Sequence, residues 1–147
     1  MPGSTRFAAA AHIMTLLAAH RGAPQTSETL AKSLATNPAV VRRLLGALAK
    51  AGLTQSDLGK GGGARLAKGP KKITLADIYR AVETPGLLPL PRSAPDPACP
   101  VGRNMAPALT AVGDAAETAF LASLEAVTLK QFAKEIAAGD AAAKSAA

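Results

Sequence analysis

The chain has 147 residues and a formal net charge of +7, which is long enough for one domain with a core of its own and an extension. Residues 1–72 hold eleven Lys/Arg against two acidic residues, whereas residues 73–147 hold six against eight. A basic first half favours a polyanionic partner for that half. The apolar runs fall far short of the roughly 20 residues that a bilayer span needs. We therefore expect a cytoplasmic protein with no membrane contact.

Several classes of site are excluded by residue type. A single cysteine, Cys99, rules out an internal disulfide and a cysteine-rich metal site within one chain. His12 and His20 lack the further ligands that a metal site needs, so we expect neither a metal nor a cofactor. The few aromatic residues disfavour single-stranded nucleic acid, which leaves duplex DNA as the better polyanion. No nucleophile with a base and no phosphate-binding loop stands out, which argues against an enzyme.

Apolar residues at three- and four-residue spacing predict helices over residues 5–20, 27–34 and 38–50. Thr26 or Ser27 can cap the second of these helices. Asn37 followed by Pro38 is a strong start for the third, because Asn caps free amides and Pro lacks the amide that would go unpaired. Two short helices joined by a tight turn, after a longer packing helix, are typical of a helix-turn-helix.

A basic hairpin follows the third predicted helix. Residues 53–58 and 64–67 read as strands, and the glycine-rich segment 59–63 reads as the turn between them. Such a hairpin directly after a candidate recognition helix is typical of a wing.

The second half predicts a helix, a loop and a long helix. Thr74 and Asp77 have capping-box spacing and open a helix that runs through Glu83. Six prolines between residues 84 and 100 forbid regular helix there. A long helix over 104–138 follows, and we expect it to pair with its copy in a second subunit through a heptad-like stripe of Met105, Leu109, Val112, Ala116, Phe120, Leu124 and Val127.

Three blocks of this sequence resemble a known family. They are NPAVVRRLLGALAKAGL at 37–53, GKGGGARLA at 59–67 and ITLADIYRAVE at 73–83. In this order and spacing they resemble the Rrf-type transcription regulators, the IscR, NsrR and CymR family, and the long terminal helix matches as well. Members with an iron–sulfur cluster place three cysteines in the loop before the long helix. Here that loop holds Cys99 alone, so cluster ligation cannot be carried over.

The candidate DNA-contacting residues lie on the third helix, on the wing and at the start of the second helix. Of Arg42 and Arg43, one can reach a guanine edge and the other a phosphate. The alternatives remain open: two solvated arginines, glycines that only make a tight turn, and hydroxyls that only cap a helix. The full set is Thr26, Ser27, Asn37, Ala39, Val40, Arg42, Arg43, Lys60, Gly61, Gly62, Gly63 and Arg65.

Cys99 is a candidate redox sensor. It stands a few residues before a predicted helix N-terminus, and Arg103 lies four residues further on; both features favour a thiolate. The alternative is an apolar filler between loop and helix.

The sequence thus predicts a mainly α protein with a small β-hairpin wing. Its expected parts are a winged helix-turn-helix head, a proline-rich sensor loop, a dimerisation helix and a disordered tail, at residues 1–83, 84–103, 104–138 and 139–147. We expect a homodimeric transcription regulator, mostly a repressor, on a palindromic duplex DNA operator, with a small-molecule or oxidant effector. The alternative is a winged-helix architectural or protein-interaction module without a specific operator.

Overall fold

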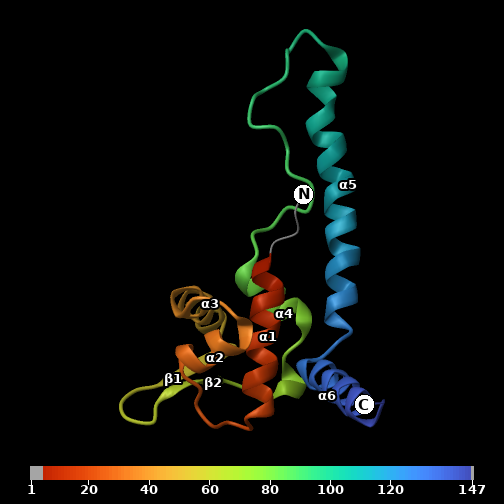
Figure 1. Ribbon diagram of the computed structural model, residues 1–147. Coiled ribbons are helices and arrows are strands. Elements are labelled where there is room, and N and C mark those ends of the chain that lie inside the picture. Colours follow the sequence, from red (N-terminus) through yellow and green to blue (C-terminus); the bar gives the residue numbers. More distant parts are fainter. Residues whose placement is uncertain (1–4, 147) are drawn as a thin grey trace. The chain divides into compact units, whose positions relative to one another are not determined.

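The computed structural model describes residues 5–146, which form two compact units. The head comprises residues 5–83 and 124–146, and the loop–helix unit comprises residues 84–123. The chain is mainly α-helical with a small two-stranded hairpin, as predicted (Figure 1). No helix within residues 5–146 is both long and apolar enough to cross a membrane. The elements are α1 (Thr5–Ala19), α2 (Ser27–Leu34), α3 (Pro38–Lys50), β1 (Thr54–Asp57), β2 (Gly63–Leu66), the 3-10 helix η1 (Pro70–Lys72), α4 (Leu75–Val82), α5 (Pro100–Glu125) and α6 (Leu129–Ala146).

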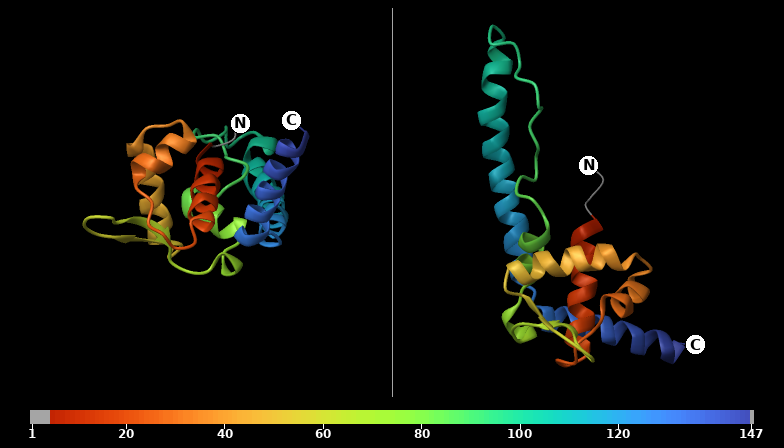
Figure 2. Two further views of the ribbon diagram at one scale, coloured as in Figure 1. Left: turned by 60° about the horizontal axis from the view of Figure 1, so that its bottom comes forward. Right: turned by 90° about the vertical axis from the view of Figure 1, so that its left-hand side faces the viewer.

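Helix α1 is the centre of the head. It lies between α2 and α3 on one side and α6 on the other (Figure 2). Its buried residues recur every three or four positions and pack against buried leucines of α2 and α3 in one core. Burying one such aliphatic side chain contributes about 1.5–3 kcal/mol. This core holds α2 and α3 together while leaving their outer faces to solvent.

The start of α4 is stabilised by the hydrogen bonds that the sequence predicts, and the end of α4 contacts α1. Thr74 Oγ1 accepts a hydrogen bond from Asp77 N at 3.1 Å, and Asp77 Oδ2 accepts one from Thr74 N at 2.9 Å. This is the predicted capping box. At the other end of α4, Glu83 Oε1 accepts from Phe7 N at 3.1 Å, and Phe7 meets Tyr79 edge to face with ring centroids 5.5 Å apart.

The predicted single helix over 104–138 is wrong. Helix α5 begins at Pro100 and ends at Glu125, and α6 starts at Leu129. Between them the backbone pairs with the segment before α4: Leu75 N donates to Val127 O at 3.0 Å, and Leu129 N donates to Ile73 O at 2.8 Å. Leu129 is fully buried in the head core. These contacts end the helical stretch at Glu125 and fix the start of α6 against the core of the head.

The predicted disordered tail at 139–147 is also corrected. Helix α6 continues to Ala146, and of the predicted tail Ala147 alone lies outside the described residues 5–146. The long helix also begins earlier than predicted, because α5 starts at Pro100 and not at residue 104. The loop is correspondingly shorter, and Pro107 lies inside the helix.

The loop–helix unit consists of residues 84–99 beside most of α5. Gly86 N donates a hydrogen bond to Glu117 Oε2 at 3.1 Å. Gly113 is buried and faces Leu88, and a Cβ added there would make ordinary van der Waals contact at 3.5 Å from the Leu88 Cβ. One loop and one helix thus form a unit of their own.

Candidate nucleic-acid interface

The turn between α2 and α3 has the geometry that the sequence predicts. Thr26 Oγ1 accepts from Thr29 N at 3.1 Å and caps α2, while Asn37 Oδ1 accepts from Ala39 N at 2.8 Å and caps α3. Ala35 closes α2 in the left-handed conformation at φ 52°. These caps satisfy amides that the first helical turns leave unpaired. Helix capping therefore accounts for Thr26 and Asn37, both exposed, without a ligand.

Helix α3 turns a continuous stripe toward solvent. Val41, Leu44 and Leu48 are buried against the head. At 3.6 residues per turn, the opposite face carries Ala39, Arg43, Gly46 and Lys50, all of which are exposed. Val40 and Arg42 flank this stripe. Arg43 and Lys50 make no ion pair within residues 5–146, so α3 presents two uncompensated cations beside small side chains.

Arg42 differs from Arg43 because it has a carboxylate partner. Its Nη2 donates to Glu28 Oε1 of α2 at 2.8 Å, with both side chains more than half exposed. A hydrogen bond from the backbone amide of Glu28 itself, and next the one from Arg42, lower the pKa of Glu28 below its ordinary value. Glu28 is thus an anion that orients Arg42 along the outer face of the helix-turn-helix.

The wing is a short antiparallel hairpin in which Gln55 pairs with Arg65 and Ser56 with Ala64. Arg65 Nε donates to Asp57 Oδ2 at 2.8 Å across the hairpin, which holds the guanidinium on the wing. Ala64 also exchanges two backbone hydrogen bonds with Gln25, at 2.8 and 2.9 Å. The wing is therefore bound to the segment that enters α2.

The wing glycines have a structural explanation. A Cβ on Gly62 would lie 2.2 Å from Asp57 O, and one on Gly63 would lie 2.5 Å from Gln25 O. Gly61 has φ +78°, which a side chain rarely tolerates. The hairpin therefore requires these three glycines whether or not DNA is bound, whereas Lys60 remains an exposed cation at the tip.

The structure adds residues that the sequence analysis missed. Leu58 at the wing tip is 95% exposed. A hollow beside α3 is lined by Arg42, Arg43, Gly46, Lys50 and, from α4, Arg80. The spacing of Gly46 and Lys50 from Arg43 was a signal for their shared face, but no local pattern places Arg80 there.

The predicted dimer stripe divides between the two units. Met105 and Val112 of α5 are 48% and 61% exposed, while Leu109, Ala116 and Phe120 are half-buried. Leu124 and Val127 instead pack against the core of the head in their own chain. The candidate seam therefore shortens to the part of α5 before residue 124.

Cys99 lies directly before α5 and is exposed. Its Sγ accepts a hydrogen bond from Gly102 N at 3.4 Å, and its carbonyl accepts one from Arg103 N at 3.0 Å. The thiol is thus both accessible and engaged with the first turn of the helix.

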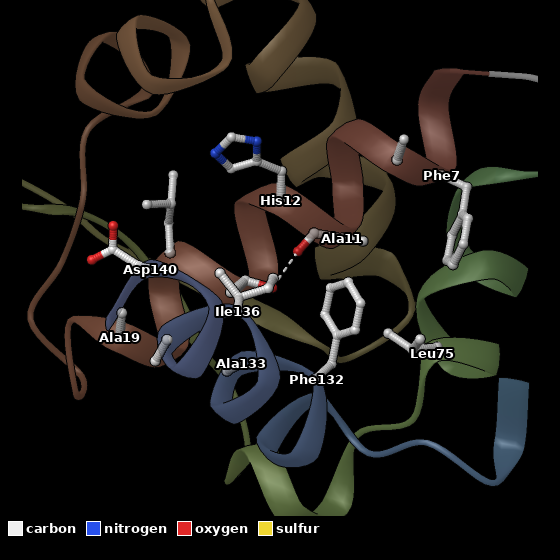
Figure 3. A pocket seen from close by; sticks show the side chains of 13 residues that line it. Phe7, Ala11, His12, Ala19, Leu75, Phe132, Ala133, Ile136 and Asp140 are labelled. Atoms are coloured by element: carbon white, nitrogen blue, oxygen red, sulfur yellow. Dashed lines mark hydrogen bonds between the residues drawn. The ribbon is translucent and has the colours of Figure 1, made fainter. Parts of the chain in front are cut away.

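A second, mainly apolar hollow of about 670 Å³ lies between α1 and α6 (Figure 3). Alanines of both helices leave the space open, and Phe7, Leu75 and Phe132 form apolar walls. His12 and Asp140 supply polar atoms, of which His12 Nε2 lies 3.1 Å from Ser33 Oγ. The volume falls within the range of about 300–1,000 Å³ that is usual for small-molecule sites.

The residues present do not fit the iron–sulfur cluster that some members of the resembled family carry. Such a cluster takes about four ligands, mostly cysteine thiolates. This chain has one cysteine, and two copies together would bring two. No group of three His, Cys, Asp or Glu in residues 5–146 is placed to hold a metal ion.

Comparisons with known proteins agree with this geometry. The Rrf2 family model, described as "Iron-dependent Transcriptional regulator", matches residues 3–135. The "Putative HTH-type transcriptional regulator YwnA" of Bacillus subtilis (strain 168) is 36% identical over 127 residues, which is 86% of this chain and 93% of the relative. Among solved structures, T. potens IscR is 25% identical with a TM-score of 0.68, covering 92% of this chain and 88% of its own. CymR (YrzC), the global cysteine regulator of B. subtilis, is 25% identical with a TM-score of 0.64, covering 92% and 98%. With a family match across most of its length and a head built as a winged helix-turn-helix, the chain belongs to the Rrf2 family of transcriptional regulators.

Proposed function

We propose that this regulator binds a palindromic operator in duplex DNA as a homodimer and acts mostly as a repressor, by occluding a promoter. The observation that carries the proposal is the exposed stripe of α3, where Arg43 and Lys50 have no acidic partner within residues 5–146. The wing adds the exposed Lys60 on the same head. Cations on a protruding helix and hairpin suit the phosphates and base edges of a duplex.

Within α3 we assign base reading to Arg43 and phosphate binding to Arg42. Arg43 projects from the middle of the solvent-facing stripe, where a guanidinium can pair with both acceptors of a guanine. Arg42 is turned by about 100° from it and is engaged by Glu28. Ala39 and Val40, near the N-terminus of α3, suit apolar contact with a thymine methyl group.

The homodimer rests on the apolar stripe of α5. Exposed Met105 and Val112 recur one heptad apart, with Leu109 between them, and a second copy would cover them. A dimer with two-fold symmetry presents two copies of α3, and these match two half-sites about one helical turn apart. This symmetry is the reason to expect a palindrome.

Selection of bound duplexes from a random pool tests the proposal. Enrichment of a palindromic sequence supports a dimeric, operator-specific regulator. Steep salt dependence without any sequence preference would instead support an architectural DNA-binding module. No duplex binding even at low salt would favour the protein-interaction alternative and overturn the DNA proposal.

We further assign redox sensing to Cys99. Its thiol is exposed and lies at the start of the helix that carries the proposed dimer seam. A peroxide would oxidise the thiol to a sulfenic acid with release of water, and a second thiol would displace another water to form a disulfide. Either product changes the first turn of α5, because Gly102 N donates to the Cys99 sulfur.

The site that we assign to a small-molecule effector is the hollow between α1 and α6. The size and apolar lining suit a mainly apolar compound with one polar group directed toward His12 or Asp140. The test uses the dye 1-anilinonaphthalene-8-sulfonate as a probe. Ala137→Phe should fill the hollow and reduce dye binding, whereas Ala138→Phe, one residue further along the exposed surface of α6, should not. If both variants bound the dye equally well, the hollow would not be the site that binds it.

A further inference from the structure

We propose that Arg80 of α4 binds a DNA phosphate beside the recognition helix, and that Glu125 holds its guanidinium until DNA displaces the carboxylate. The inference rests on the proposed DNA-binding function and extends the interface beyond the helix-turn-helix and the wing. It assigns a role to an ion pair between residues that lie 45 positions apart in the chain.

Arg80 lies beside the cations of α3. It lines the same hollow as Arg42, Arg43 and Lys50, so four cations surround one depression along the side of α3. When a helix enters the major groove, residues alongside it face the phosphates that border the groove. Arg80 is therefore placed to contact the backbone while Arg43 contacts base edges.

Arg80 forms an exposed ion pair with Glu125. Arg80 Nη2 donates to Glu125 Oε1, and the two side chains are 49% and 50% exposed. An ion pair this open to solvent is weak and exchanges readily. The two non-bridging oxygens of a DNA phosphate can accept from a guanidinium bidentately, as a carboxylate does, and the neighbouring phosphates of the duplex add to the attraction, so a phosphate can displace the carboxylate.

The backbone around Glu125 holds this carboxylate near α4. Glu125 is the last residue of α5, directly before the segment that pairs with residues 73–75. Leu75 N donates to Val127 O, and Thr74 forms an antiparallel bridge with Thr128. This pairing sets the end of α5 against the start of α4, and so places the carboxylate within reach of Arg80.

The same arrangement occurs at Arg42, whose partner is Glu28. Two of the four cations around the hollow thus have an exposed carboxylate that a phosphate can replace, whereas Arg43 and Lys50 make no ion pair within residues 5–146. The carboxylates reduce the positive charge of the free protein without blocking its surface.

The test compares Arg80→Gln, Glu125→Gln and the charge-matched control Lys144→Gln. Lys144 also forms an exposed ion pair, with Asp140 on α6, but it does not line the hollow beside α3. Fluorescence anisotropy measures the Kd of the full chain for its selected duplex, and for an unrelated duplex of equal length, across a series of NaCl concentrations. Thermal unfolding of each variant shows that the fold is intact, and Arg80→Lys keeps the charge as a second variant.

We expect Arg80→Gln to weaken binding to both duplexes by about fivefold per protomer near 0.15 M salt, and to reduce the slope of log K against log salt by about 0.9 per lost contact. Glu125→Gln should strengthen binding by about 1.5- to 5-fold, the range of an exposed ion pair. That gain should vanish in the double variant with Arg80→Gln, because the carboxylate acts only through Arg80.

Two results overturn the inference in distinguishable ways. If the parent binds DNA and Arg80→Gln has the salt slope and the Kd of Lys144→Gln, then Arg80 makes no phosphate contact while the proposed function stands. If the parent binds no duplex at low salt, the proposed function fails and this inference fails with it.

Discussion

Gly46 lies in the middle of α3, the proposed recognition helix, where a glycine weakens the fold. In a helix interior, glycine is about 0.5–1 kcal/mol less favourable than alanine. A Cβ added at Gly46 would meet no atom within 4 Å, so neither packing nor a clash requires the glycine. Gly46→Ala should therefore stabilise the protein by about 0.5–1 kcal/mol and raise its Tm by roughly 1–4 °C.

The same change should weaken DNA binding. Gly46 lies on the solvent-facing stripe between Arg43 and Lys50, where α3 would approach the floor of the major groove. An added methyl group there keeps the backbone from approaching closely and shifts both cations from their contacts. We expect a loss of about 1–3 kcal/mol, equivalent to one good base contact, or roughly 5- to 150-fold in Kd.

Thermal unfolding and anisotropy with the selected operator measure the two effects in one sample. Gly139→Ala in α6 is the matched control, because a Cβ there also meets nothing within 4 Å. The control should gain similar stability and leave the Kd unchanged. If Gly46→Ala bound the operator as tightly as the parent, the stripe through Gly46 would not be the surface that faces the bases.

Three further changes test the other assignments. Arg43→Ala should weaken operator binding by about 1–3 kcal/mol and relax base preference at one position. Arg42→Ala should instead weaken binding to all sequences alike. If both variants relaxed the base preference equally, the division of roles between the two arginines would be refuted. Val112→Asp should give monomers in sedimentation with poor operator affinity, since the exposed Val112 supports no core of its own chain, and a dimer would remove the α5 seam. Mild peroxide should lower the operator affinity of the parent but not of Cys99→Ser, and equal loss in both would reduce Cys99 to a surface residue.

The sequence by itself determined those elements whose signals are local. Asn37-Pro38 placed the start of α3 correctly, because capping and the missing proline amide act within one helical turn. Thr74 and Asp77 predicted their capping box for the same reason. The order of helix, helix-turn-helix and wing followed from periodicity and glycine spacing, whereas the family followed from the resemblance of three sequence blocks to a known one.

The C-terminal half shows where local signals were insufficient. The apolar spacing of Leu124 and Val127 fits a continuing heptad stripe, and for that reason the sequence predicted one helix through the break. Thr128 and Gln131 have the spacing of a capping box, and in the structure Thr128 caps α6 while the Gln131 side chain accepts from Thr128 N. The signal was present but competed with an apolar pattern of equal strength.

Only the tertiary structure decided which charges remain uncompensated around the hollow beside α3. Arg42 and Arg43 are adjacent and alike in the sequence, yet one has Glu28 as a partner and the other makes no ion pair in the described chain. Arg80 meets Glu125 only because backbone hydrogen bonds between residues 73–75 and 127–129 bring the end of α5 to the start of α4. Periodicity and capping act over one or two helical turns, whereas these ion pairs depend on packing between segments that are distant along the chain.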